Sequence, residues 1–224
     1  MSEITAQPQN ASQTAFRLSA SDLEIWRGET LLLNGFSCHV DAGELVWLRG
    51  PNGAGKTTLM RILLGLSHPE AGQISWCGRD IREARADFLA DAAWCGHQPG
   101  LRPELTPHEN LAAWLPLCGR PSGRRIEEAL ALVGLGDRQA QPCHSLSAGQ
   151  VRRAGLARLL LSEARLWCLD EPLTSLDAEG QTLVARLLAD HCRQGGAALV
   201  SSHQALPESA GPIRELRIGR EGTQ

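Results

Sequence analysis

The segment that most constrains this chain is Gly50-Pro51-Asn52-Gly53-Ala54-Gly55-Lys56-Thr57, which Thr58 follows. It fits the phosphate-binding pattern G-x-x-x-x-G-K-S/T at every fixed position. Glycines are needed there because the backbone must fold around an anion with its N–H groups pointing inward. The pattern predicts that Lys56 reaches the β- and γ-phosphates of a nucleotide and that the Thr57 hydroxyl binds Mg²⁺.

The residues on both sides of this loop predict the strand and the helix that the motif requires. Residues 45–48 form a short apolar run typical of a buried strand. A helix is expected from about Lys56 to Leu64, and its apolar face continues to Leu66. Its N-terminus and dipole would point at the same anion. Lys56 is the only lysine of the chain, which indicates a position where a compact ammonium is needed. We therefore predict a nucleoside triphosphate site.

Composition and charge argue against several classes of protein. An apolar fraction of 42% and a charged fraction of 21% are typical of a globular protein. The net charge of −3 argues against nucleic-acid binding as the main activity. We expect no membrane-spanning segment, because no run of about 18 apolar residues occurs. Residues 1–15 are polar, lack the apolar region of a secretory signal and are expected to form a flexible tail.

The seven cysteines are dispersed, without a C-x-x-C pair. We interpret them as reduced thiols of a cytosolic protein rather than as disulfides or a metal site. Three adjacent Cys–His pairs occur, at 38–39, 143–144 and 191–192. A metal site would need more ligands brought together, so we favour a structural interpretation for all three pairs.

The order of the predicted elements indicates the fold class. Residues 16–40 alternate as antiparallel strands do, with expected turns at Arg27-Gly28 and Asn34-Gly35. A turn is expected at 69–72, further strands at 73–76, 92–96, 166–169, 197–201 and 213–218, and helices at 82–89, 126–133, 149–161 and 178–194. We expect an α/β P-loop NTPase core over 16–98 and 163–224. An antiparallel β subdomain begins this core, and a helical subdomain over about 99–162 is inserted into it.

Two acidic residues, Asp170 and Glu171, directly follow the apolar strand at 166–169. A buried strand that ends on an acid places it beside the phosphate loop in this kind of sheet. Asp170 is therefore predicted to hold Mg²⁺, and Glu171 to polarise an attacking water.

Two other segments have both a structural and a functional interpretation. Residues 146–150 open a helix, where Ser147 is expected to be an N-cap. The same geometry could bind a second phosphate, although the segment alone favours the cap. Trp26 lies in the first turn, ahead of the phosphate-loop strand. It could stack on a purine or cover a sheet edge, and the sequence leaves both open.

These segments occur in the order found in ABC-type ATPase subunits, which the chain resembles from about residue 16 to its C-terminus. The resemblance is carried by the phosphate loop, Gln98, 146–150, Asp170-Glu171, 175–177 and His203. It implies a head-to-tail homodimer with two ATPs, each held between the phosphate loop of one subunit and the signature segment, residues 146–150, of the other. One departure is Ala148, where many relatives have glycine. We expect this small change to leave function intact.

The resemblance also implies roles in hydrolysis for three residues. Gln98 would contact Mg²⁺ and the lytic water, and it would sense the transport partner. Glu171 would act as the general base, and His203 would contact the γ-phosphate.

Five further residues would act in nucleotide binding and in coupling the two sites. Ser147 and Gly149, with Gln150 in the same segment, would bind the γ-phosphate of the ATP held by the other subunit. Asp177 would couple the two sites. The resemblance also favours Trp26 as the aromatic residue that stacks on adenine.

A closer resemblance is to the ATP-binding subunits of bacterial haem exporters of cytochrome c biogenesis. It is carried by 96–101, 105–106, 109–111, Arg152-Arg153, 166–172 and 202–204. It implies a peripheral ATPase on the cytoplasmic face of the inner membrane, bound to integral membrane subunits. That complex would move haem or release a haem-loaded chaperone. No direct haem binding is expected, because the His and Cys residues form no axial-ligand motif.

Three alternatives belong to other functional classes. An ABC subunit for another substrate would share the same ATPase motifs. Soluble ABC ATPases that act on DNA or ribosomes usually carry a second ATPase unit, a coiled coil or zinc cysteines, none of which this sequence shows. A kinase or GTPase would leave the segment 146–150 and His203 without a use.

Overall fold

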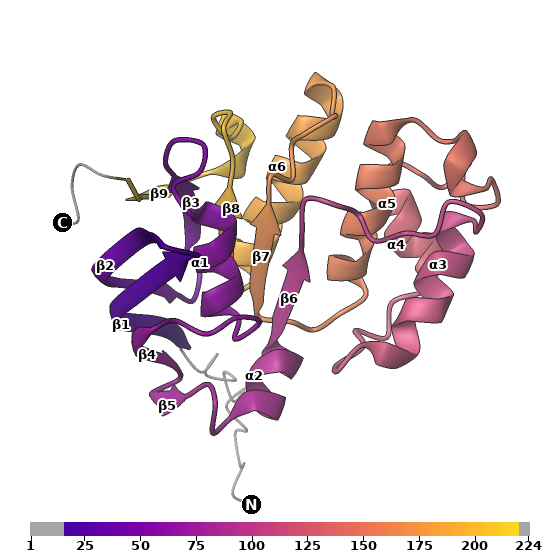
Figure 1. Cartoon of the computed structure of the whole chain (residues 1–224). Coiled ribbons are helices and arrows are strands. Elements are labelled where there is room, and N and C mark those ends of the chain that lie inside the picture. The colour runs from indigo at the N-terminus through magenta and orange to yellow at the C-terminus, as the bar shows by residue number, and fades with distance from the viewer. Residues whose placement is uncertain (1–15, 220–224) are drawn as a thin grey trace, which may run out of the picture.

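The computed structural model describes residues 16–219, so the predicted tail over 1–15 lies outside the described residues. The chain forms two sheets and a group of helices (Figure 1). The first sheet is antiparallel, in the order β2 (Thr30–Asp41), β1 (Arg17–Arg27), β4 (Ala71–Trp76) and β5 (Arg79–Asp80). The second is parallel, in the order β6 (Ala92–Cys95), β7 (Leu166–Asp170), β8 (Ala197–Ser201), β3 (Leu45–Arg49) and β9 (Arg214–Arg217). The predicted α/β fold class with an antiparallel first part is confirmed.

Helices cover both faces of the parallel sheet. On one face, α1 (Lys56–Leu63) packs in a cluster with the buried sides of the antiparallel strands. On the other face, α5 (Ala148–Leu160) and α6 (Ala178–Arg193) pack on the alternate residues of the same strands. Because both faces are covered, β7 and β8 are buried at every position, which explains their continuous apolar sequences.

The helices between β6 and β7 form a cluster of their own, at the right of Figure 1. They are α3 (Pro107–Trp114), α4 (Ile126–Leu132) and α5, with a short 3₁₀ turn over 115–117. Thr106 caps α3: its hydroxyl accepts from the Glu109 N–H, and the Glu109 carboxylate accepts from the Thr106 N–H.

Four local predictions differ from the structure. Asn34-Gly35 lies inside β2, because the pairs Leu23–Phe36 and Ile25–Leu33 leave these two residues opposite Glu24 as a bulge. A glycine with φ +63 suits a bulge as well as a turn, so the local signal was ambiguous.

The other three concern two helices and the start of a strand. Helix α1 stops before Leu66, which is 44% exposed, because Gly65 adopts a left-handed conformation that ends it. Helix α2 spans Arg85–Asp91 rather than 82–89, since the Asp80 carboxylate accepts from the Arg82 N–H and forms a turn there. Strand β4 begins at Ala71, within the expected turn.

The cysteines are all free thiols, and most are shielded from solvent. Burial raises the pKa of Cys38 to about 12 and that of Cys192 to about 11. Both thiols therefore stay protonated at neutral pH, in which form they are poor nucleophiles and poor metal ligands.

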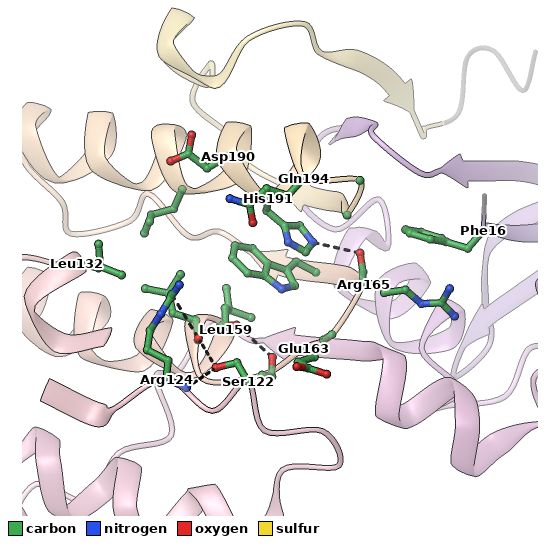
Figure 2. Close-up of a pocket in the computed structure, with 17 residues that line it drawn as sticks. Phe16, Ser122, Arg124, Leu132, Leu159, Glu163, Arg165, Asp190, His191 and Gln194 are labelled. Atoms are coloured by element: carbon green, nitrogen blue, oxygen red, sulfur yellow. Dashed lines mark hydrogen bonds between the residues drawn. The ribbon is translucent and has the colours of Figure 1, made fainter. Parts of the chain in front are cut away.

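His191 is a buried histidine whose protonation makes the stability of the fold depend on pH. Its ring is hydrogen-bonded through Nε2 to the Arg165 carbonyl oxygen at 3.1 Å. Figure 2 shows this contact in a pocket between α6 and the helices that connect β6 to β7. The ring also stacks on Trp167 with centroids 3.8 Å apart. Burial lowers the pKa of His191 to about 4. The folded protein therefore holds this imidazole neutral where the unfolded chain would be protonated.

We expect His191 to destabilise the protein in mild acid. Since its pKa is about 6.5 when unfolded, the unfolded state binds the extra proton between about pH 6.5 and pH 4. The free energy of unfolding should fall across this window by about 3 kcal/mol at most. Urea unfolding of the wild type and of His191→Gln, which does not titrate, measures the effect. Parallel pH dependences for the two proteins would contradict it.

Candidate active site

The phosphate loop needs its glycines for two separate physical reasons. At Gly50 a Cβ would lie 2.4 Å from the Ile218 carbonyl oxygen, so only glycine permits the close approach of β9. Gly53 and Gly55 have φ values of +81 and +96, which side chains disfavour. Strand β3 and α1 bracket the loop as predicted.

Lys56 lies against the loop rather than in solvent. It is 8% exposed, and its ammonium donates to the carbonyl oxygens of Gly50, at 2.9 Å, and Pro51, at 3.3 Å. A compact ammonium with three donors fits this curved backbone, as the single lysine of the sequence suggested. The positive charge is thus held at the position where the motif places nucleotide phosphates.

Asp170 meets Thr57 although β3 and β7 are not neighbours in the sheet. The Thr57 hydroxyl donates to Asp170 Oδ2 at 2.7 Å, and the Ser201 hydroxyl donates to Oδ1. Strand β8 lies between the two strands and ends at Ser201, so it fills the gap. Ser201 is a residue of this site that no sequence motif marks. A hydroxyl and a buried carboxylate are the hard oxygen ligands that Mg²⁺ prefers, so these residues fit that ion.

Glu171 and His203 lie together at the ends of β7 and β8. Glu171 has φ +52, and its N–H donates to the Ser201 carbonyl at 3.0 Å and the Ser201 hydroxyl at 3.1 Å. Glu171 Oε2 accepts from the His203 N–H at 3.2 Å. Oε1 also lies 3.2 Å from His203 Nε2, without the alignment of a hydrogen bond. The carboxylate, 17% exposed, is oriented beside the imidazole and can act on a water.

The signature segment starts α5, and its structural role is clear. Ser147 is the N-cap, as predicted, and the Gln150 side chain accepts from the Ser147 N–H in return. A Cβ on Gly149 would lie 2.7 Å from the Ser175 carbonyl oxygen, so glycine is required there by packing. Ser147 and Ala148 are exposed at the helix N-terminus, where an anion would be favoured.

Three other predicted site residues lie at the surface. Asp177 caps α6 by accepting from the Gly180 N–H at 2.8 Å. Gln98 is exposed just beyond β6. Trp26 is 43% exposed beside the equally exposed Leu31, its partner in the β1–β2 pairing, and its indole N–H donates to Glu24. Within residues 16–219 no hydrogen bond joins these three side chains to the phosphate loop.

A matched pair of substitutions tests the packing of the signature segment. Gly149→Ala should lower ATP hydrolysis by about tenfold or more, because the new Cβ must displace Ser175 and with it Asp177. Ala148→Gly changes the exposed neighbour and should leave the rate within about twofold. Steady-state phosphate release measures both. Equal rates for the two variants would show that the close approach to Ser175 does not matter.

Comparisons with known proteins identify the family. The family model described as "ABC transporter" matches residues 33–174. The "Cytochrome c biogenesis ATP-binding export protein CcmA 2" of Salmonella paratyphi A is 45% identical over 90% of this chain and 96% of its own. The CcmA protein of Methylococcus capsulatus is 46% identical over 90% and 97%. The chain belongs to the CcmA family of ABC transporter ATPases.

Solved structures agree with this fold. A "Putative ABC transporter (ATP-binding protein)" from Pyrococcus furiosus aligns with a TM-score of 0.76 at 24% identity, over 90% of this chain and 97% of that one. Membership of the ABC transporter family implies that the chain binds a nucleotide and is an ATPase coupled to transport. Among the described residues, none of the helices of this CcmA-family member is long and apolar enough to cross a membrane.

Proposed function

We propose that the chain is the ATP-hydrolysing subunit of a membrane complex that exports haem, or releases a haem-loaded chaperone, in c-type cytochrome biogenesis. The observation that carries the proposal is the Thr57–Asp170 contact beside Glu171 and His203, in a chain 45% identical to a cytochrome c biogenesis export protein. The fold and the geometry of the site support the proposed ATP hydrolysis. The similarity to the relatives supports the proposed role in cytochrome c biogenesis.

Within one subunit, each residue of the site has a proposed task. Lys56 binds the β- and γ-phosphates. Thr57 and Asp170, with Gln98, would hold Mg²⁺, which neutralises phosphate charge when it is bound. Glu171 takes the proton of the attacking water, and His203 orients Glu171 and contacts the γ-phosphate.

We further propose that two chains form a head-to-tail homodimer around two ATPs. The exposed N-terminus of α5, with Ser147, Gly149 and Gln150, would meet the γ-phosphate on the other subunit. Asp177, next to the Ser175 turn that contacts Gly149, would couple the two sites. Trp26 would stack on adenine, which its exposure at the end of β1 permits.

The membrane partner is proposed to bind beside the helical subdomain of residues 99–162, near Gln98. This part carries Leu117, which is 81% exposed, and Leu89 on α2 is 39% exposed. The two parts approach there, since a Cβ on Gly119 would lie 3.1 Å from the Ala90 backbone. We propose that these two exposed leucines contribute to that interface. We place the complex on the cytoplasmic face of the inner membrane, with no direct haem or nucleic-acid contact by this chain.

The test uses the native host with Glu171→Gln in place of the wild type. Haem-stained c-type cytochromes are measured, with ATP binding of the purified variant confirmed. Loss of covalent haem while the apocytochromes are still made and exported would support the proposal. Unchanged cytochromes would contradict the proposed haem role but not the ATPase activity. A membrane partner that co-purifies with the chain would then identify the substrate.

A further inference from the structure

Arg152 is a buried charge that the roles above leave unused. It lies in the second turn of α5 and is 3% exposed. Its guanidinium donates only to backbone carbonyls in the described hydrogen bonds. These belong to Gly96 (2.8 Å), His97 (2.7 Å), Asp170 (2.8 Å), Glu171 (2.6 Å) and Pro172 (3.4 Å). One side chain thus binds both the residues before Gln98 and the residues at the proposed general base.

The position of this guanidinium explains its acceptors. The pairing of β6 with β7 ends at Cys95 and Leu169. The next two residues on each strand are those whose carbonyls accept from the two terminal nitrogens of Arg152. The guanidinium therefore joins the strand ends where the backbone ladder stops. A planar fork with five donors can span both pairs of carbonyls, whereas an ammonium cannot.

The same contacts hold the backbone of Glu171. A left-handed φ of +52 is sparsely populated for a residue with a side chain and persists only where neighbours impose it. Ser201 accepts from the Glu171 N–H, and Arg152 donates to the Glu171 carbonyl. The direction of the carboxylate follows from this backbone, so both contacts determine where the proton acceptor lies.

Helix α5 contacts the segment of residues 96–100, called the Gln98 loop below. Arg152, Gly155 and Arg158, spaced by three residues along α5, all contact residues 96–100. A Cβ on Gly155 would lie 3.0 Å from the Pro99 Cβ, and Arg158 donates to the carbonyls of Pro99 and Gly100. Residues 96–100 therefore lie along the helix that begins at Ser147, and a shift of either moves the other.

We propose that Arg152 is a positioning residue for ATP hydrolysis. It fixes the left-handed backbone of Glu171 and ties that residue to the Gln98 loop. A displacement of the loop or of α5 then misplaces the general base. This inference rests on the proposed role of Glu171, and it assigns a route by which the loop controls hydrolysis.

The test compares Arg152→Lys with Arg153→Lys in the full-length chain. Arg153 is adjacent on α5 but donates to the carbonyls of Val133 and Gly134, inside the helical insert. Steady-state kinetics give kcat and KM for MgATP, and mass spectrometry gives amide hydrogen exchange of segments 96–101 and 170–173. Arg152→Gln serves as a second variant if the lysine variant does not fold.

We expect Arg152→Lys to lower kcat by about tenfold or more, with KM changed by less than about threefold. Both segments should exchange faster. Arg153→Lys should change neither the kinetic constants nor the exchange rates of the two segments. A kcat within about twofold of wild type, or equal losses for both variants, would overturn the inference. A wild-type chain that does not hydrolyse ATP, or a fully active Glu171→Gln variant, would instead refute the proposed function.

Discussion

Replacing Glu171 by glutamine should lower the rate of ATP hydrolysis by about 10²–10⁴-fold while ATP still binds. Glutamine has the same size and can accept from the His203 N–H as Glu171 Oε2 does. Its amide cannot take a proton from water, however. ATP is then bound without being consumed, so two chains should stay closed around it. Phosphate release, equilibrium ATP binding and the solution mass with ATP measure the three effects.

The control for this experiment is Glu179→Gln, an exposed acid in the first turn of α6. It removes the same charge away from the site and should keep the wild-type rate. A Glu171→Gln protein that hydrolyses ATP within about threefold of wild type would exclude Glu171 as the base. Failure to dimerise at saturating ATP would contradict the proposed sandwich.

Asp170→Asn should remove most of the benefit that Mg²⁺ gives to ATP binding and hydrolysis. The carboxylate is 3% exposed and accepts from Thr57 and Ser201, so its charge is held at one point. Asparagine preserves the shape but is a weak ligand for a hard cation. We expect hydrolysis to fall by about 10²-fold or more and the Mg²⁺ concentration for half-maximal rate to rise. Rates measured over a Mg²⁺ titration at fixed ATP test this.

A matched control is available in Asp91, the other buried aspartate among the described residues. Its carboxylate accepts from Trp76 Nε1 at 3.0 Å and from Arg120 and Arg165, far from the phosphate loop. Asp91→Asn should lower the free energy of unfolding by about 2 kcal/mol and leave the Mg²⁺ dependence unchanged. If Asp170→Asn shows the same Mg²⁺ dependence as Asp91→Asn, Asp170 does not bind the ion.

Several features of this protein were decided by residues close together in the sequence. The phosphate loop, its strand and its helix follow from glycine spacing and apolar periodicity. The caps at Thr106 and Ser147 follow from side chains that bond the backbone three residues on. The buried strands β7 and β8 follow from continuous apolar runs. Such interactions involve neighbours in the chain, so the pattern alone predicts them.

Other features depended on which strands lie side by side. Ser201 binds Asp170 only because β8 is inserted between β3 and β7. The left-handed backbone of Glu171 is held by residues far from it in the sequence. The five carbonyl contacts of Arg152 likewise join α5 to distant segments. The sequence by itself determined the elements and the identity of most site residues. Only the tertiary structure decided how they are held, because each long-range partner is set by strand order and by helix packing.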